Sequence, residues 1–149
     1  MWEEIMNNLE QQLSEKEQQI FKNKRIHLGI FVEPFLTYML DGKKTIESRF
    51  SKKKILPFEK ISKEDIVLVK KSGGKIVAYF TIKEVLFFDL QNYSIDVIKT
   101  KYNKELCVDD DFWVKKENSR YATLIKIDKL VELKPFSINK KGMQTWIEL

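Results

Sequence analysis

The stretch Asp41-Gly42-Lys43-Lys44-Thr45-Ile46-Glu47-Ser48-Arg49-Phe50 joins a helix-like segment to a strand-like one. Residues 35–40 before it are mostly apolar, and we expect a short helix there that ends at Gly42. Glycine ends helices because it enters the left-handed region without a Cβ penalty. Residues 45–50 then read as a strand.

Three charged side chains follow the glycine closely: Lys44, Glu47 and Arg49. Successive strand side chains point to opposite faces, so Glu47 and Arg49 share one face. Two interpretations are open from the residue types. In the first, this is a solvent-exposed strand face whose ion pair contributes little to stability. In the second, the three residues are the charged groups of a binding site.

The pattern Gly-x-Lys-x-x-Glu-x-Arg, formed by Gly42, Lys44, Glu47 and Arg49, resembles the signature of the ASCH (activating-signal-cointegrator homology) domain. This family is related to the PUA RNA-binding barrels. The likeness extends over about residues 26–149, where an acidic turn, a Phe-Trp pair and an alternating strand follow in the order of bacterial ASCH domains. The resemblance implies a cleft between barrel and helices in which the motif residues converge.

Strand-like and helix-like segments also favour this fold. Apolar, β-branched stretches occur at 26–31, 65–71, 75–88, 119–127 and 130–136, and helix-like segments at 93–102 and 109–113 lie between the third and fourth stretches. Strands and helices do not alternate regularly, which argues against a doubly wound parallel sheet. We therefore expect an α+β fold, a PUA-like mixed β-barrel of five or six strands with short covering helices.

Residues 1–22 lie outside the resemblance, and we expect them to form an N-terminal helical extension of a domain at 23–149. Residues 2–22 contain no Gly or Pro, and the apolar Trp2, Met6, Leu9, Leu13 and Ile20 are spaced for one amphipathic helix. Such a helix is too short to be stable alone. It would pack on the barrel or on its equivalent in a second copy, forming a homodimer.

Composition excludes several protein classes. A chain of 149 residues with 43% hydrophobic residues can bury one substantial core. It has no apolar run of about 20 residues and no basic-then-apolar leader, so we expect a cytoplasmic protein.

Cys107 and His27 are the only residues of their types, which disfavours a disulfide and a zinc site. Without a Gly-rich phosphate loop or a nucleophile elbow, no cofactor is expected.

The positive charge is concentrated after residue 22. Residues 23–149 contain 25 Lys and Arg against 17 Asp and Glu, a balance of +8. A basic body suits a domain that binds a polyanion, but it also suits an ordinary lysine-rich protein, and charge alone does not choose between them. Outside the motif, the basic residues predicted to contact nucleic acid are Lys52, Lys53, Lys54, Lys70, Lys71 and Arg120. The alternative is that Lys52–Lys54 form an ordinary solvated loop.

The favoured function is a nucleic-acid or nucleotide-binding module. Proteins read RNA mainly as unpaired bases, stacked on aromatic rings and hydrogen-bonded at their edges. Glu47 would accept hydrogen bonds from a base, Arg49 would orient the base and hold a phosphate, and Lys44 would neutralise charge. Because a cleft carboxylate contributes little to a core, Glu47→Gln would leave the fold intact.

A hydrolase is the first alternative. Acetylcytidine amidohydrolases of the same superfamily use the Lys and Thr of a Gly-x-Lys-x-x-Thr motif and a distant Glu. Lys44 matches their lysine, but Glu47 stands where their threonine would be, and Thr45 is a poor substitute. Lys44 and Glu47 could instead act as an acid–base pair on RNA or on a modified nucleoside. A second alternative is a protein-interaction adaptor built on the N-terminal helix.

Overall fold

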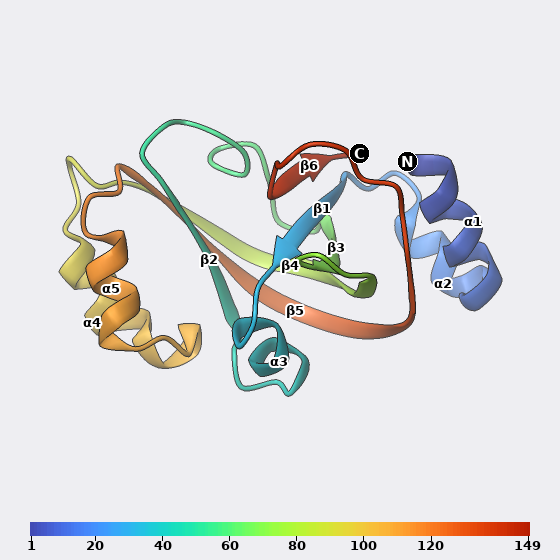
Figure 1. Cartoon of the computed structure of the whole chain (residues 1–149), viewed down its shortest axis with the longest axis horizontal. Coiled ribbons are helices and arrows are strands. Elements are labelled where there is room, and N and C mark those ends of the chain that lie inside the picture. The colour runs from blue at the N-terminus through green and yellow to red at the C-terminus, as the bar shows by residue number, and fades with distance from the viewer.

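The computed structural model describes all 149 residues as one sheet with a pair of helices at each end and a fifth helix between them (Figure 1). The helices are α1 (Trp2–Gln12), α2 (Glu15–Phe21), α3 (Phe35–Leu40), α4 (Ile95–Leu106) and α5 (Asp110–Lys116). The strands are β1 (Ile26–Phe31), β2 (Ile46–Ser51), β3 (Ile66–Lys71), β4 (Ile76–Asp89), β5 (Tyr121–Phe136) and β6 (Trp146–Glu148).

The six strands form a mixed sheet in the order β2-β5-β4-β3-β1-β6. β1 and β3 are parallel, and all other neighbours are antiparallel. The β4–β5 ladder is long and contains several register shifts, which increase local twist and bend a sheet. The sheet therefore curls into a half-barrel with β2 and β6 at its edges. This confirms the predicted α+β fold, but the two segments predicted at 119–127 and 130–136 form one continuous strand, β5 (Tyr121–Phe136).

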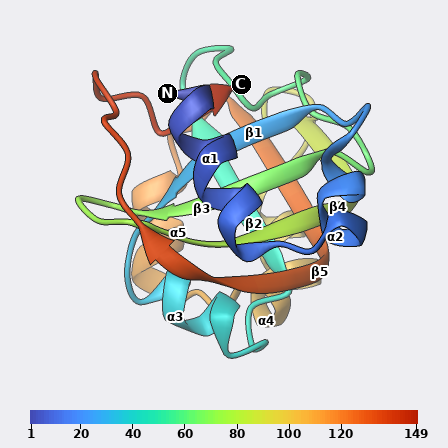
Figure 2. The same ribbon diagram turned by 90° about the vertical axis from the view of Figure 1, so that its right-hand side faces the viewer.

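Three apolar clusters hold the sheet and helices together. The concave interior is filled by side chains such as Phe31, Val67, Phe80, Ile125 and Trp146. At one end α4 and α5 cover β2 and β5 through a second cluster, whose buried members are Ile46, Ile98, Leu106, Trp113, Ala122 and Leu124 (Figure 1). At the other end α1 lies over β1 and β3 (Figure 2). No helix is both long enough and apolar enough to cross a membrane.

The N-terminal segment contains two helices where the sequence predicted one. Ser14 interrupts the predicted helix with a capping box. Its hydroxyl accepts from the Glu17 amide, and the Glu17 carboxylate accepts from the Ser14 amide. A residue that starts a new helix in this way ends the previous one. The buried side chains are Ile5, Leu9, Leu13 and Phe21, whereas the predicted seam residues Trp2 and Ile20 are exposed.

The motif segment forms the predicted helix, glycine turn and strand. α3 ends at Leu40, and Gly42 has φ of +77°, the conformation for which glycine is suited. The amides of Lys43 and Lys44 both donate to the Tyr38 carbonyl and tighten the turn before β2. Glu47 and Arg49 stand opposite Ile125 and Thr123 of β5, two fully buried residues. Their side chains therefore point to the concave side of the sheet.

Candidate functional site

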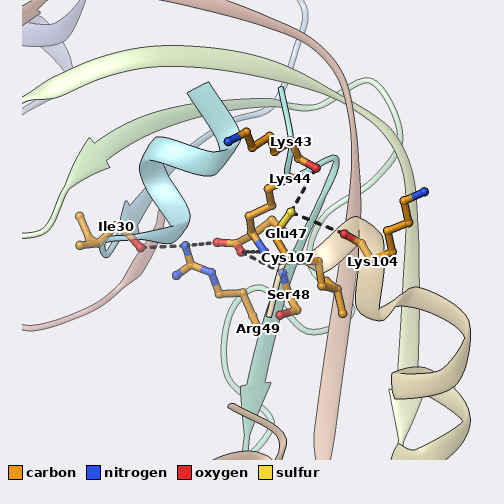
Figure 3. Close-up of polar contacts among 9 residues, drawn as sticks. Ile30, Lys43, Lys44, Glu47, Ser48, Arg49, Lys104 and Cys107 are labelled. Carbon is orange, nitrogen blue, oxygen red and sulfur yellow. Dashed lines mark hydrogen bonds and ion pairs between the residues drawn. The ribbon is translucent and has the colours of Figure 1, made fainter. Parts of the chain in front are cut away.

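Lys44, Glu47 and Arg49 form one charged network, whose carboxylate pairs with both cations (Figure 3). Only 3% of Lys44 and 7% of Glu47 is exposed. The Lys44 Nζ lies 3.6 Å from Glu47 Oε1, and Arg49 Nη2 donates to Glu47 Oε2 at 3.1 Å. The interpretation as a solvent-exposed strand face is wrong, because Lys44 and Glu47 are buried and the Arg49 side chain is only 16% exposed.

Arg49 bridges the open side of the half-barrel. Its guanidinium donates to the carbonyl of Ile30 at 2.8 Å and to that of Thr145 at 3.2 Å. Ile30 belongs to β1 and Thr145 precedes β6, so these bonds join the β2 edge of the sheet to the opposite edge. The guanidinium carbon also lies 4.8 Å from the centre of the Phe31 ring and 5.2 Å from that of Trp146. Arg49 is thus fixed by both edges and by two aromatic rings.

Lys44 ties the network to the end of α4. Its Nζ donates to the Leu106 carbonyl at 2.6 Å, one of the terminal carbonyls that a helix leaves without an internal partner. The Nζ also lies 5.4 Å from the Phe35 ring centre. Burial lowers the pKa of Lys44 below its ordinary value of 10.5, and the negative charge of Glu47 opposes this shift.

The network forms part of the wall of a cavity of about 250 Å³. Phenylalanine rings from β1, α3, β2 and α5 line the same cavity: Phe31, Phe35, Phe50 and Phe112. Pockets for drug-sized ligands usually measure about 300–1,000 Å³, so this cleft suits a small group such as one base. Flat aromatic faces beside a fixed hydrogen-bond acceptor are what a protein uses to bind an unpaired base.

The other predicted contact residues lie outside this cleft. Lys52, Lys53 and Lys54 are exposed on the loop after β2, and Lys54 pairs with Glu59 at 3.4 Å. Arg120 pairs with Asp89 at 3.1 Å. Lys70 is buried near the end of β3, with its Nζ 3.4 Å from the Lys71 carbonyl, and Lys71 itself is exposed. The structure thus brings together three of the nine predicted residues.

Lys116 is a cleft residue that the sequence interpretation missed. It lies in the last turn of α5, its Nζ is 5.4 Å from the Phe112 ring centre, and both residues line the cavity. Burial lowers the pKa of Lys116, and the nearby charge of Arg49 lowers it further. The spacing of Phe112 and Lys116 was the available signal, because residues four apart share a helix face.

Some alternatives find less support from the geometry. Thr45 is exposed and lines a separate depression with Lys101 and Tyr102, so it does not face the Lys44–Glu47 pair. No three His, Cys, Asp or Glu side chains are grouped so that they could hold a metal ion. Larger depressions of about 570 and 740 Å³ lie elsewhere, but neither is lined by a buried ionisable side chain. The cleft beside β2 is therefore the best candidate site.

Comparison with known proteins identifies the fold. No protein-family model and no curated protein matches the sequence. Among solved structures, that of ASCH from Zymomonas mobilis superposes with a TM-score of 0.66 at 13% identity, covering 83% of this chain and 87% of that chain. A tyrosine-to-phenylalanine variant of the Zymomonas mobilis protein gives a TM-score of 0.67 at 13% identity, covering 85% and 91%. At this level of identity the likeness concerns the fold.

Proposed function

Because the chain has the ASCH fold, we propose that its cleft binds single-stranded RNA or a nucleotide. One unpaired base would enter the cavity and stack on a phenylalanine ring. Glu47 would accept hydrogen bonds from amino or imino groups of that base. The positive charge of residues 23–149 would attract the phosphate backbone.

The observation that carries this proposal is a buried carboxylate held in place at an aromatic-lined cavity. Arg49 and Lys44 fix the two oxygens of Glu47, so the acceptor is already oriented before a ligand arrives. Fixed acceptors raise selectivity, because a ligand without the matching donor would leave a buried charge unpaired. Burying three charges at one place costs stability compared with an apolar core, and a binding role explains why they are there.

A binding titration with a matched pair of aromatic variants tests the proposal. Filter binding of a short single-stranded RNA should give a log affinity that falls linearly with log salt, with a slope of about −0.7 per phosphate contacted. Phe112→Leu keeps an apolar side chain but removes a ring of the cleft, and should weaken binding by about 1–3 kcal/mol. Phe88, which stacks on Tyr93 away from the cleft, provides the control Phe88→Leu. It should bind like wild type.

Two results would reject the proposal. One is no detectable RNA binding at low salt. The other is equal weakening by Phe112→Leu and Phe88→Leu, which would assign the effect to general loss of packing. Circular dichroism on each variant would identify loss of fold before any affinity is compared.

A second candidate function is hydrolysis of RNA or of a modified nucleoside, and one observation favours it. Burial lowers the pKa of Lys44, and its Nζ lies 3.6 Å from the carboxylate of Glu47, so a proton donor and a proton acceptor stand side by side at the cleft. The pair would act as acid and base on a ligand in the cleft.

Turnover assays separate the two candidates. Wild type, Lys44→Ala and Glu47→Gln would be tested for RNA cleavage and for release of acetate from acetylcytidine. If Glu47 is a general base, Glu47→Gln should lower turnover by roughly 100-fold to 10,000-fold while binding is nearly kept. If Glu47 only recognises a base, wild type should show no turnover and the variant should bind about 1–3 kcal/mol more weakly. We expect the second result.

A further inference from the structure

We propose that Lys116 is the anion-binding group of the cleft. It would bind a phosphate of the same nucleotide whose base donates hydrogen bonds to Glu47. This inference rests on the proposed function for the identity of the ligand as a nucleotide. It assigns the phosphate to a residue outside the sequence motif. Three cations face the cavity, Lys44, Arg49 and Lys116, and they differ in how far their charge is already engaged.

Arg49 has its charge and several of its donors already engaged. It bonds two backbone carbonyls and the Glu47 carboxylate, and its guanidinium lies beside both Phe31 and Trp146. A phosphate that drew it away would break the link between the two edges of the sheet. Arg49 therefore acts as a positioning residue for Glu47 and the cleft wall.

Lys44 is engaged in a similar way. Its ammonium group donates to the Leu106 carbonyl and faces Glu47, and almost none of the side chain is exposed. Its charge balances that of Glu47 inside the protein. Figure 3 shows Lys44, Glu47 and Arg49 gathered together, with Arg49 reaching toward Ile30.

Lys116 is the cation without an acidic partner. Its side chain makes no ion pair and donates no hydrogen bond, although it is half-buried against Phe112. The adjacent Lys115 differs: it is exposed and its Nζ pairs with Asp111 at 3.0 Å. A half-buried ammonium without a counter-charge costs free energy, and an anionic ligand would supply that counter-charge.

The charge of the cavity wall supports the same ligand. Three cations and one carboxylate line it, a balance of +2 when all four are charged. The charge of Arg49 acts unfavourably on Lys116, and the charge of Glu47 only partly offsets this. An anion beside Lys116 would relieve the repulsion, while a donor-bearing group would still be needed at Glu47. A nucleotide carries both features, whereas a nucleoside carries only the second.

The test compares ligands that differ only by the phosphate, on proteins that differ only at one lysine. Calorimetry would measure binding of the four ribonucleosides, their 5′-monophosphates, an RNA trinucleotide without terminal phosphates, and inorganic phosphate. The proteins would be wild type, Lys116→Gln, Lys116→Arg and the control Lys115→Gln. If the cleft binds a terminal phosphate, the monophosphates should bind more tightly than the nucleosides. If it binds a phosphodiester, the trinucleotide should bind more tightly than the nucleosides.

In wild type we expect at least one phosphate-bearing ligand to bind about 10-fold to 100-fold more tightly than its nucleoside, as for a hydrogen bond to a charged group. Lys116→Gln should remove this gain, and Lys116→Arg and Lys115→Gln should keep it. The inference is overturned if nucleotides and nucleosides bind equally, if Lys116→Gln keeps the gain, or if Lys115→Gln loses it equally.

Failure of the proposed function would look different. No nucleoside, nucleotide or RNA would bind to wild type, yet inorganic phosphate would still bind in a way that Lys116→Gln abolishes. That result rejects the nucleotide and keeps Lys116 as an anion site. If phosphate binding is also absent or insensitive to Lys116→Gln, both proposals are rejected.

Discussion

Two groups of charged residues lie close together in the sequence but differ in their surroundings. In the cleft, Lys44 and Glu47 are buried, the Arg49 side chain is 16% exposed, and each of the three contacts at least one of the others. In the loop after β2, Lys52–Lys54 are exposed, and the Lys54–Glu59 pair has side-chain exposures of 63% and 55%. The sequence presents both groups as one basic stretch.

The difference predicts two separate contributions to binding. Buried charges are screened little by salt and are held in one geometry, so the cleft should determine which ligand binds. Exposed lysines interact with phosphate mainly by releasing counterions, so the loop should determine how binding depends on salt. Substitutions confined to one region should therefore change one contribution and leave the other unchanged.

The largest expected effect is on stability, from loss of a charge in the cleft. Glu47→Gln leaves Arg49 and Lys44 buried beside a neutral group, and breaking a buried ion pair costs about 3–5 kcal/mol. The expectation from the sequence that this change leaves the fold unaffected is therefore revised, because Glu47 is buried and bonded on both oxygens. Glu59→Gln is the matched control in the loop, with an expected loss of about 0–1 kcal/mol. Equal losses in urea unfolding would show that the two pairs do not differ.

A core substitution far from the cleft separates loss of stability from loss of binding. Leu9 of α1 is 1% exposed and packs in the cluster over β1 and β3. Leu9→Ala should cost about 2–5 kcal/mol, the range for a buried leucine. At a temperature where the variant is folded, its RNA affinity should equal that of wild type. The result would also test whether residues 1–22, proposed as an extension, support the domain at 23–149.

The next effect concerns the loop alone. Replacing Lys52, Lys53 and Lys54 by Gln should reduce the steepness of log affinity against log salt by up to about 0.7 for each phosphate that the loop no longer neutralises. The melting temperature should change little, because exposed substitutions usually alter stability by less than about 0.5 kcal/mol. An unchanged salt slope would mean that the loop does not touch the phosphate backbone.

The smallest effect is a pH dependence specific to the cleft. The pKa of Lys44 is lower in the folded protein than its ordinary value of 10.5, so the unfolded chain binds more protons between these two values. Wild type should therefore gain stability relative to Lys44→Met as pH rises through that window. Tyr79, whose pKa is raised by burial, acts in the opposite direction but is present in both proteins and cancels. A constant difference in urea midpoint across alkaline pH would contradict this account.

The sequence predicted the fold well where signals were local. The glycine after α3, the alternation in β2 and the apolar runs of β1, β3 and β4 each depend on a few neighbouring residues. The break at Ser14 was also encoded locally, by Ser14 and Glu17, but the absence of Gly and Pro hid it. The start of α5 is local as well, since the Oδ1 of Asp109 accepts from the Phe112 amide.

The site was predicted only in part, because it is assembled from distant segments. Lys44, Glu47 and Arg49 share one stretch and could be found together. Lys116 and Phe112 come from α5, and their approach to β2 depends on packing of the helix pair that no local pattern specifies. Likewise, no local pattern indicates that Arg49 bonds the Ile30 and Thr145 carbonyls, since this depends on how far the sheet curls.

The central claim is that RNA enters the cleft instead of lying only on the basic loop. Titration of a short single-stranded RNA into isotope-labelled protein, followed by amide chemical shifts, tests it directly. We predict that the saturating shifts fall on residues around the cavity, in 30–35, 47–50 and 112–116, with weaker and salt-sensitive shifts at 52–54. Shifts confined to residues 52–54, or to a face remote from β2 and α5, would contradict the account.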